Sequence, residues 1–315
     1  MKRESRFKAV AATLTLLAGV FFGGLAPARA DISALTNEID NGHWVPYVAT
    51  EAAPNRQKQA SRDSIVADLN VLKKRGFTAI STYGCDNNML ENIIPEECDR
   101  LGLKMIIGVW DPYKTSEIDA AVRAANKHKC VLAVSVGNEG GCVNQSEVNP
   151  NSDKRYTFAR AVEVENEIRS RTGKPVTSVE QFEKYTNKTL MDGGDFLMPN
   201  IHPFWNKAWE PHRGVEFTME KYMWLRNLSS KPIICKEVGY PTSSTPDYPK
   251  GRTEATPMNE DVQATYFKEL ATKPIHFMYF EAFDCNWKDW NATEKHWGIY
   301  NNNRTPKKTV SILPF

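Results

Sequence analysis

The sequence predicts a single-domain α/β protein with the (β/α)8 fold, a TIM barrel. From Trp44 onward, short runs of β-branched and aromatic residues alternate with longer segments of helical periodicity, which is the pattern of βα units around a parallel sheet. There are eight such runs, and residues 31–315 provide more than the roughly 250 residues that one α/β barrel needs. No linker divides these residues, so we expect one domain.

The eight runs are expected to form the barrel strands. Two of the segments between them, 64–75 and 157–171, place their apolar residues on one helical face. Gly76, Gly102 and Gly173 each follow a helical segment and precede a run, as glycine does at a helix C-terminus. An open doubly wound sheet is the alternative, but no glycine-rich phosphate turn follows the first run. The expected strands are residues 44–48, 78–82, 104–110, 131–137, 175–179, 196–202, 232–238 and 276–283.

Residues 1–30 have the features of an export signal that is removed. Four basic residues precede an apolar stretch, 9–25, and Ala28-Arg29-Ala30 offers a small-x-small cleavage site. A membrane anchor is the competing interpretation, but threonines and a Gly-Gly pair interrupt the apolar stretch and no second one of spanning length follows. We expect residues 31–315 to form a secreted, extracellular or periplasmic barrel, with no membrane association after cleavage and no second subunit.

Charge argues against a polyanionic partner. The chain has 40 Lys and Arg against 38 Asp and Glu, and residues 1–30 hold five of the basic and one of the acidic residues, which leaves 35 against 37. Nucleic-acid-binding proteins usually carry a basic surplus in clusters, whereas the basic residues here are scattered among acidic ones. We therefore expect no nucleic-acid partner.

Six cysteines in an exported chain allow disulfides but are too few for a dense framework. Cys130 and Cys142 lie at opposite ends of a predicted strand and cannot easily pair with each other. Cys85 with Cys98, and Cys142 with Cys285, stay open as pairs across neighbouring loops.

The sequence carries no motif for a metal or a cofactor. Its six histidines show no HExxH or close pairing, and the glycine fingerprint of flavin or nicotinamide binding is missing. We interpret His202 and His276 as packed or hydrogen-bonded strand residues.

Two glutamates at the ends of expected strands are the candidates for chemistry. In such a barrel the active site lies at the C-terminal ends of the strands, and strands four and seven end in Glu139 and Glu237. A carboxylate that leaves an apolar strand must be solvated, paired or catalytic, and either glutamate alone would be interpreted as structural. About three βα units separate them, which places them across the barrel mouth from each other. Two facing carboxylates are what glycosidic cleavage requires.

Strand eight continues into an aromatic and charged cluster. Residues 280–288 read FEAFDCNWK, and Trp290, Trp297 and Tyr300 follow. Because sugar rings stack their apolar faces on aromatic rings, such a rim suits a saccharide cleft. Most of these aromatics are expected to pack in the core, and Trp287 is the best stacking candidate.

The motifs together resemble glycoside hydrolase family 17, which contains β-1,3-glucanases and related glucanosyltransferases with this barrel fold. The likeness covers nearly all of residues 31–315. It is strongest at VGNEGG (136–141), KEVGYPT (236–242), FEAFDCNWK (280–288) and EKHWGIY (294–300), with weaker support from STYG (81–84) and IHPFW (201–205).

The resemblance implies a role for each matching residue. Glu139 is the implied acid/base and Glu237 the implied nucleophile, Asn138 would bind the sugar 2-hydroxyl, and Tyr83 would line the catalytic subsite near Glu237. One departure is Cys285, because many relatives carry Glu there; Glu281, on the same face of the strand, is a candidate to compensate. The residues implied to bind substrate or shape the cleft are Tyr83, Asn138, Trp205, Glu281, Phe283, Trp287, Lys288 and Glu294.

These residues predict a retaining β-glucan hydrolase that acts by double displacement and needs no cofactor. A transglycosylase would use the same residues. A non-catalytic glucan-binding barrel is the third interpretation, and it is favoured if Cys285 disables the charge network around Lys288. The β-1,3 linkage is implied by the resemblance alone, and β-1,6 or mixed-linkage glucans fit the residues equally well.

Overall fold

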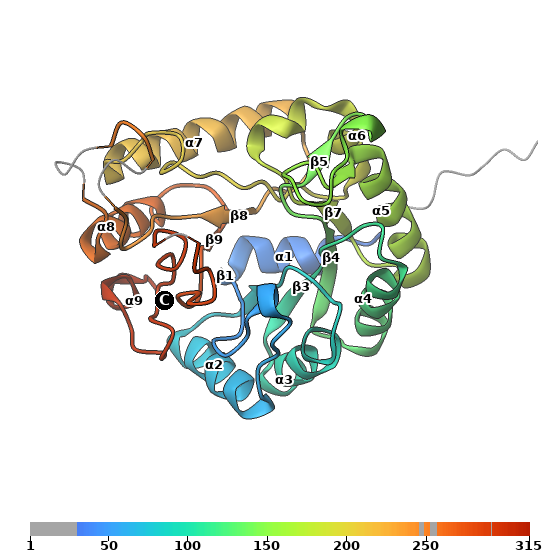
Figure 1. Cartoon of the computed structure of the whole chain (residues 1–315), viewed down its shortest axis with the longest axis horizontal. Helices are drawn as coiled ribbons and strands as arrows, with labels where there is room; N and C mark the ends of the chain where they lie inside the picture. The colour runs from blue at the N-terminus through green and yellow to red at the C-terminus, as the bar shows by residue number, and fades with distance from the viewer. Residues whose placement is uncertain (1–29, 246–248, 253–256, 291) are drawn as a thin grey trace, which may run out of the picture.

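The computed structural model describes residues 30–245, 249–252, 257–290 and 292–315. Seven parallel strands form one curled sheet in the order β7-β4-β3-β2-β1-β9-β8, with helices around its outside (Figure 1). The α/β class is confirmed. The strands of this sheet are β1 (Trp44–Pro46), β2 (Ala79–Ser81), β3 (Lys104–Val109), β4 (Val131–Val136), β7 (Val176–Ser178), β8 (Cys235–Val238) and β9 (Phe277–Tyr279).

Seven of the eight expected runs become strands, and the sixth, 196–202, does not. This segment lies between β7 and β8, where it makes isolated parallel bridges from Asn200 to Gln181 and from Leu197 to Ile233. Pro199 explains the interruption because proline has no N–H to give to a sheet ladder. Its carbonyl still accepts from the Lys236 N–H at 2.9 Å, so the segment hydrogen-bonds to both neighbours without forming a regular strand.

Helices cover the outer face of the sheet, and their ends follow local sequence signals. The expected helices at 64–75 and 157–171 are present as α2 and α5. Gly76, Gly102 and Gly173 take the left-handed conformation after α2, α3 and α5, with φ of 109°, 67° and 65°. The helices are α1 (Ser33–Asn41), α2 (Arg62–Arg75), α3 (Ile94–Leu101), α4 (Thr115–Lys127), α5 (Phe158–Thr172), α6 (Lys188–Gly193), α7 (Pro211–Leu228), α8 (Glu260–Leu270) and α9 (Lys308–Ile312).

The first helix closes one end of the curled sheet. Figure 1 shows α1 across the middle of the ring of elements. Its buried Leu35 and Ile39 join an inner apolar cluster with Trp44 of β1, and the Trp44 indole donates to the Glu38 carbonyl at 2.9 Å. The inner cluster also takes one or two residues from each strand or segment around the ring: Ala79, Ile106, Ala133, Val179, Phe196, Met198, Ile234 and Met278.

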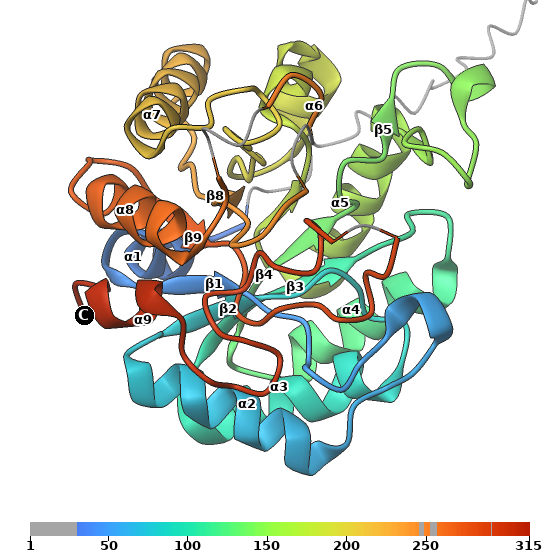
Figure 2. The ribbon, with the colours of Figure 1, turned by 60° about the vertical axis from the view of Figure 1, so that its left-hand side comes forward.

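A small second sheet, not expected from the sequence, lies at the opposite end. It pairs β5 (Gly141–Cys142) with β6 (Tyr156–Thr157) in parallel. Figure 2 shows this region projecting beyond the ring of helices beside α5. The described part of the loop at 241–259 forms no helix or strand before α8.

Among the described residues no helix combines the length and the apolar character needed to cross a bilayer. The expected export signal lies almost wholly outside the described residues. All six cysteines are buried free thiols, so neither Cys85 with Cys98 nor Cys142 with Cys285 forms a disulfide.

Candidate active site

A cleft of about 1390 Å³ lies over the C-terminal ends of the strands. Loops after β1, β2 and β3 line one part of it, and residues 200–206 with the segments at the ends of β4, β7, β8 and β9 line the rest. Both candidate glutamates are in its wall. The aromatic residues that line it are Tyr47, Tyr83, Trp110, Phe182, Trp205, Phe280, Trp287, Trp290 and Trp297.

Glu139 reaches the cleft through an unusual turn at the end of β4. Gly137 and Glu139 both have positive φ, 72° and 52°. Gly137 must be glycine, because a Cβ there would overlap the Tyr156 hydroxyl. A positive φ is uncommon for glutamate and persists only where the surroundings hold it; here the Glu139 N–H donates to the Val179 carbonyl at 3.0 Å. The Glu139 carboxylate then accepts from the Asn200 amide at 2.9 Å.

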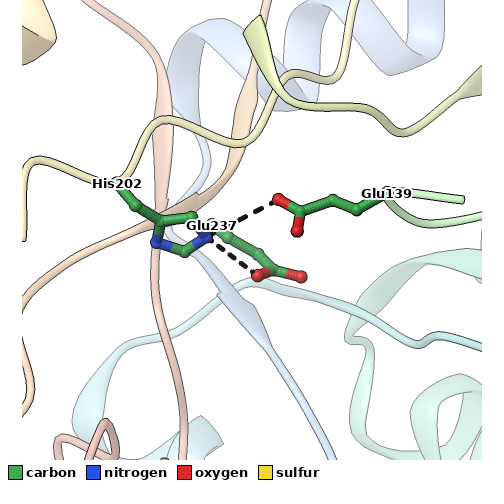
Figure 3. Close-up of side chains that lie close together, drawn as sticks. All are labelled: Glu139, His202 and Glu237. Carbon is green, nitrogen blue, oxygen red and sulfur yellow. Dashed lines mark hydrogen bonds and ion pairs between the residues drawn. The ribbon is translucent and has the colours of Figure 1, made fainter. Parts of the chain in front are cut away.

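Glu237 faces Glu139 from β8, and His202 lies between them. His202 Nε2 is 3.2 Å from Glu237 Oε2 and 3.8 Å from Glu139 Oε1. Figure 3 shows the three side chains converging from three different parts of the chain. One oxygen of each carboxylate and a ring nitrogen of His202 all lie within 4.8 Å of one another. The two carboxylates are therefore close enough to act on one glycosidic bond.

The surroundings push the pKa values of the two glutamates in opposite directions. Burial raises the pKa of Glu139, and the negative charge of Glu237 raises it further, against smaller effects of His202 and Asn200. Burial also acts to raise the pKa of Glu237, but the hydrogen bond and charge of His202, with Lys236 and Lys288, outweigh it and the net pKa is lowered. Divergent pKa values are how two carboxyls take an acid and a nucleophile role.

The same contacts favour the charged form of His202. Burial alone would lower its pKa, but the hydrogen bond that it donates to Glu237 and the charges of Glu237, Glu139 and Glu294 raise it above the usual histidine value. The sequence was interpreted as making His202 a packed or hydrogen-bonded strand residue, with no place in the site. Its ring does pack edge-on against Phe280 and Trp297, at 5.6 and 5.5 Å between centroids, but its nitrogen belongs to the site.

The cluster after β9 keeps a charge network around Cys285. Lys288 Nζ lies 3.3 Å from Glu281 Oε1 and 3.8 Å from Glu294 Oε2. The Cys285 thiol donates to the other Glu281 oxygen at 3.3 Å. Glu281 is thus the carboxylate partner of Lys288, the compensating position that the sequence suggested. Trp287 packs edge-on against Trp290 at 5.6 Å.

The cleft brings together nearly all of the residues singled out from the sequence. Tyr83 reaches Glu237 with its hydroxyl, which hydrogen-bonds to that carboxylate. Phe283 is the exception: it does not line the cleft, its side chain is 1% exposed, and it packs against Tyr47 and Tyr300. The predicted residues that line the cleft are Tyr83, Asn138, Glu139, Trp205, Glu237, Glu281, Trp287, Lys288 and Glu294.

Three residues besides His202 belong to the site but were not predicted from the sequence: Asn200, Gln181 and Lys236. Asn200 and Gln181 hydrogen-bond to Glu139, and Lys236 lies beneath the cleft. The one signal available was position, because each lies at or near the end of an expected strand.

Within the described chain, Glu139, His202 and Glu237 are the one group of acidic, His or Cys side chains close enough to share a cation. Their atoms already engage one another through the His202–Glu237 hydrogen bond. Glu139 Oε1 lies farther off, 3.8 Å from His202 Nε2, so the three side chains form a charged cluster around one hydrogen-bonded pair.

A curled parallel sheet with two facing carboxylates in an aromatic cleft at its C-terminal edge is the arrangement that glycosidic cleavage requires. The chain belongs to the family described as the BtgE/BtgC glycoside hydrolase domain, whose model matches residues 45–298.

Curated relatives agree with this assignment. "Probable beta-glucosidase btgE" of Aspergillus clavatus is 28% identical over 253 residues, which cover 76% of this chain and 42% of that protein. The chain thus spans less than half the length of such relatives. "Glucan 1,3-beta-glucosidase" of Arthroderma benhamiae is 26% identical over 266 residues, covering 76% of this chain and 82% of that protein.

Solved structures share the fold. A glycoside hydrolase family 17 β-1,3-glucanosyltransferase from Rhizomucor miehei superimposes with a TM-score of 0.69 at 20% identity, covering 86% of this chain and 97% of that one. An endo-laminarinase from Formosa superimposes with a TM-score of 0.71 at 16% identity, covering 85% of each chain.

Proposed function

We propose that the protein is a retaining β-1,3-glucan hydrolase in which Glu139 is the general acid/base and Glu237 the nucleophile. The observation that carries this proposal is the carboxylate pair, with one oxygen of each within 4.8 Å and with pKa values shifted apart. Retaining enzymes hold their carboxyls about 5–5.5 Å apart, whereas inverting enzymes leave about 6.5–9.5 Å for a water molecule.

The reaction proceeds in two displacements. Glu139, whose raised pKa favours the protonated form, gives its proton to the glycosidic oxygen while Glu237 attacks the anomeric carbon, so the C–O bond breaks and a glycosyl ester forms. The leaving sugar departs as an alcohol. Glu139, now a carboxylate, takes a proton from a water molecule that attacks the same carbon and releases Glu237. The sugar keeps its anomeric configuration.

A β-1,3-glucan substrate is supported by the names of the relatives and by the cleft. The Arthroderma relative is named as a glucan 1,3-β-glucosidase, and one Rhizomucor structure holds laminaritriose. The cleft offers aromatic faces for several sugar rings. We further propose membership of glycoside hydrolase family 17, with residues 196–202 as the irregular eighth strand of a (β/α)8 barrel.

Incubation with laminarin, lichenan and pustulan, followed by sizing of the products, tests the substrate. We expect cleavage of laminarin first, and endo or exo action follows from the product lengths. Release from pustulan alone would contradict the β-1,3 assignment. No cleavage of any of the three would leave the non-catalytic glucan-binding barrel.

Azide rescue with an aryl β-laminaribioside tests the two roles. In Glu237→Ala, azide attacks directly and gives the α-glycosyl azide; in Glu139→Ala, the ester still forms because the aryl group leaves unaided, and azide then gives the β-glycosyl azide. Glu183→Ala is the matched control, because Glu183 is an exposed glutamate that also lines the cleft. Identical azide products from both variants would contradict the assignment.

A β-1,3-glucanosyltransferase is the second candidate, because the Rhizomucor structure that shares the fold is one and transfer would use the same two carboxylates. Product analysis at high laminari-oligosaccharide concentration distinguishes them: longer oligosaccharides indicate transfer, and shorter ones alone indicate hydrolysis.

We also propose export of the chain as a monomer, with residues 1–30 removed. N-terminal sequencing of the protein from the culture medium or periplasm and sedimentation of the purified protein test both points. An intact N-terminus or a stable dimer would contradict them.

A further inference from the structure

Lys236 is a fully buried lysine directly before Glu237. Its side chain is 0% exposed, and it does not line the cleft. Ile234, two residues earlier, belongs to the inner apolar cluster, and because side chains alternate along a strand, Lys236 also points inward. Ser81 follows Ala79 of that cluster by two residues, and Ser135 follows Ala133 in the same way. Both serines therefore lie at the same level as Lys236. Lys236 thus brings a cation into a polar layer between the inner apolar cluster and the cleft.

The ammonium group of Lys236 touches the site from below. Nζ lies 3.4 Å from Asn138 Oδ1 and 3.8 Å from the centroid of the Tyr83 ring. The titratable groups that face it are Glu237 on its own strand, Glu139 after β4 and Tyr83 after β2. Burying a lysine is costly unless it is paired and hydrogen-bonded, and packing alone does not account for a charge at this position.

We propose that Lys236 is a positioning residue for the glycosidase reaction, which orients Asn138 and supplies a positive charge beneath the two glutamates. The inference rests on the proposed function of Glu139 and Glu237.

The orientation follows from hydrogen-bond chemistry. An ammonium group has three donors and no acceptor, so Lys236 binds Asn138 by its carbonyl oxygen. The Asn138 NH2 group is then left to face the cleft, which Asn138 lines. Asn138 therefore acts as a donor to the substrate, and the sugar hydroxyl opposite it accepts.

The charge acts on the nucleophile. Lys236 helps to lower the pKa of Glu237 and so keeps it ionised. Burial lowers the pKa of Lys236 itself to about 8, although Glu237 and Glu139 both act to raise it. Lys236 is therefore charged below about pH 8. Above that pH it loses its charge and no longer lowers the pKa of Glu237.

Three variants separate the two contributions. Lys236→Met removes the hydrogen bond to Asn138 and the charge. Lys236→Gln keeps a donor for Asn138 without the charge. Lys236→Arg keeps both the donor and the charge in a larger group. Lys307→Met is the matched control, because Lys307 is also buried but pairs with Asp284 outside the cleft.

We expect Lys236→Met to lower kcat on laminari-oligosaccharides roughly 10- to 100-fold, as misplacement of a positioning group does, with a much smaller change in KM. The acidic limb of the kcat profile should move up by about one pH unit, because Glu237 loses a nearby cation. Lys236→Gln should recover part of kcat but keep the shifted limb. Lys307→Met should leave both limbs where they are.

Thermal unfolding establishes that each variant is folded before its kinetics are compared. A folded Lys236→Met with the wild-type kcat and wild-type pH limbs overturns the inference, as does a limb shift of the same size in Lys307→Met. If Lys236→Met does not fold, the Lys236→Gln profile decides: an unshifted acidic limb overturns the role of the charge. Wild-type protein inactive on every β-glucan refutes the proposed function instead, so the two failures are distinguishable.

Discussion

Replacement of His202 by phenylalanine should separate its packing from its chemistry. Phenylalanine keeps an aromatic ring against Phe280 and Trp297 but removes the nitrogen 3.2 Å from Glu237 Oε2. A hydrogen bond to a charged group is worth about 1.5–3 kcal/mol. If that bond acts on the ionised nucleophile as the ester forms, its loss lowers kcat by about 10- to 150-fold.

The same replacement should move the acidic limb of the pH profile. The His202 hydrogen bond and charge lower the pKa of Glu237, so removing them raises that pKa. Glu237 then becomes protonated, and inactive, at a higher pH. An opposite charge at such a distance shifts a carboxyl pKa by about 1–3 units, and we expect the limb to rise within that range.

Steady-state hydrolysis of a chromogenic β-laminaribioside between pH 3 and about 9, the range in which these groups titrate, measures both effects. His212→Phe is the matched control, because His212 pairs with Glu269 and Glu216 on the exposed side of α7. If folded His202→Phe keeps the wild-type kcat and acidic limb, the assignment of His202 to the site is refuted.

Three further predictions address the charge network, the strained turn and the aromatic rim. Glu281→Gln should lower kcat/KM about tenfold or more, because it removes the charge that pairs with the partly buried Lys288; an unchanged kcat/KM would show that the pair is dispensable. Gly137→Ala should lower the free energy of unfolding in urea by about 2–4 kcal/mol, since it combines a positive φ with overlap of a tyrosine hydroxyl. Gly173→Ala, which has the positive φ but nothing within 4 Å of its Cβ, should cost about 1–2 kcal/mol, and equal costs would contradict this account. Trp287→Ala should raise KM about tenfold with little change in kcat, as for a stacking contact; a fall in kcat at constant KM would place Trp287 in the chemistry instead.

Local features of the fold were predictable because their causes are local. The glycines after α2, α3 and α5 end helices through their own backbone conformation, and seven of the eight runs carry enough β-branched or aromatic residues to form strands. The irregularity at 196–202 also has a local cause, because Pro199 removes one N–H donor from the sheet ladder.

The candidate site was predictable only where strand order places residues opposite each other. Glu139 and Glu237 could be paired by counting βα units. The contacts of His202 with Glu237 and of Lys236 with Asn138 depend on side-chain directions inside the barrel, which spacing does not give. Phe283 shows the same limit, because Phe280 on the same segment lines the cleft while Phe283 packs in the core.

The most direct test of the central claim is to trap the glycosyl-enzyme. A 2-deoxy-2-fluoro-β-laminaribiosyl fluoride slows both displacements, but its good leaving group lets the first one proceed, so the ester accumulates. Peptide mass spectrometry should then find the sugar on Glu237 in the wild-type protein, and Glu237→Gln should take up no label. A label on another residue, or release of the α-anomer from a natural β-glucan, would contradict the retaining mechanism.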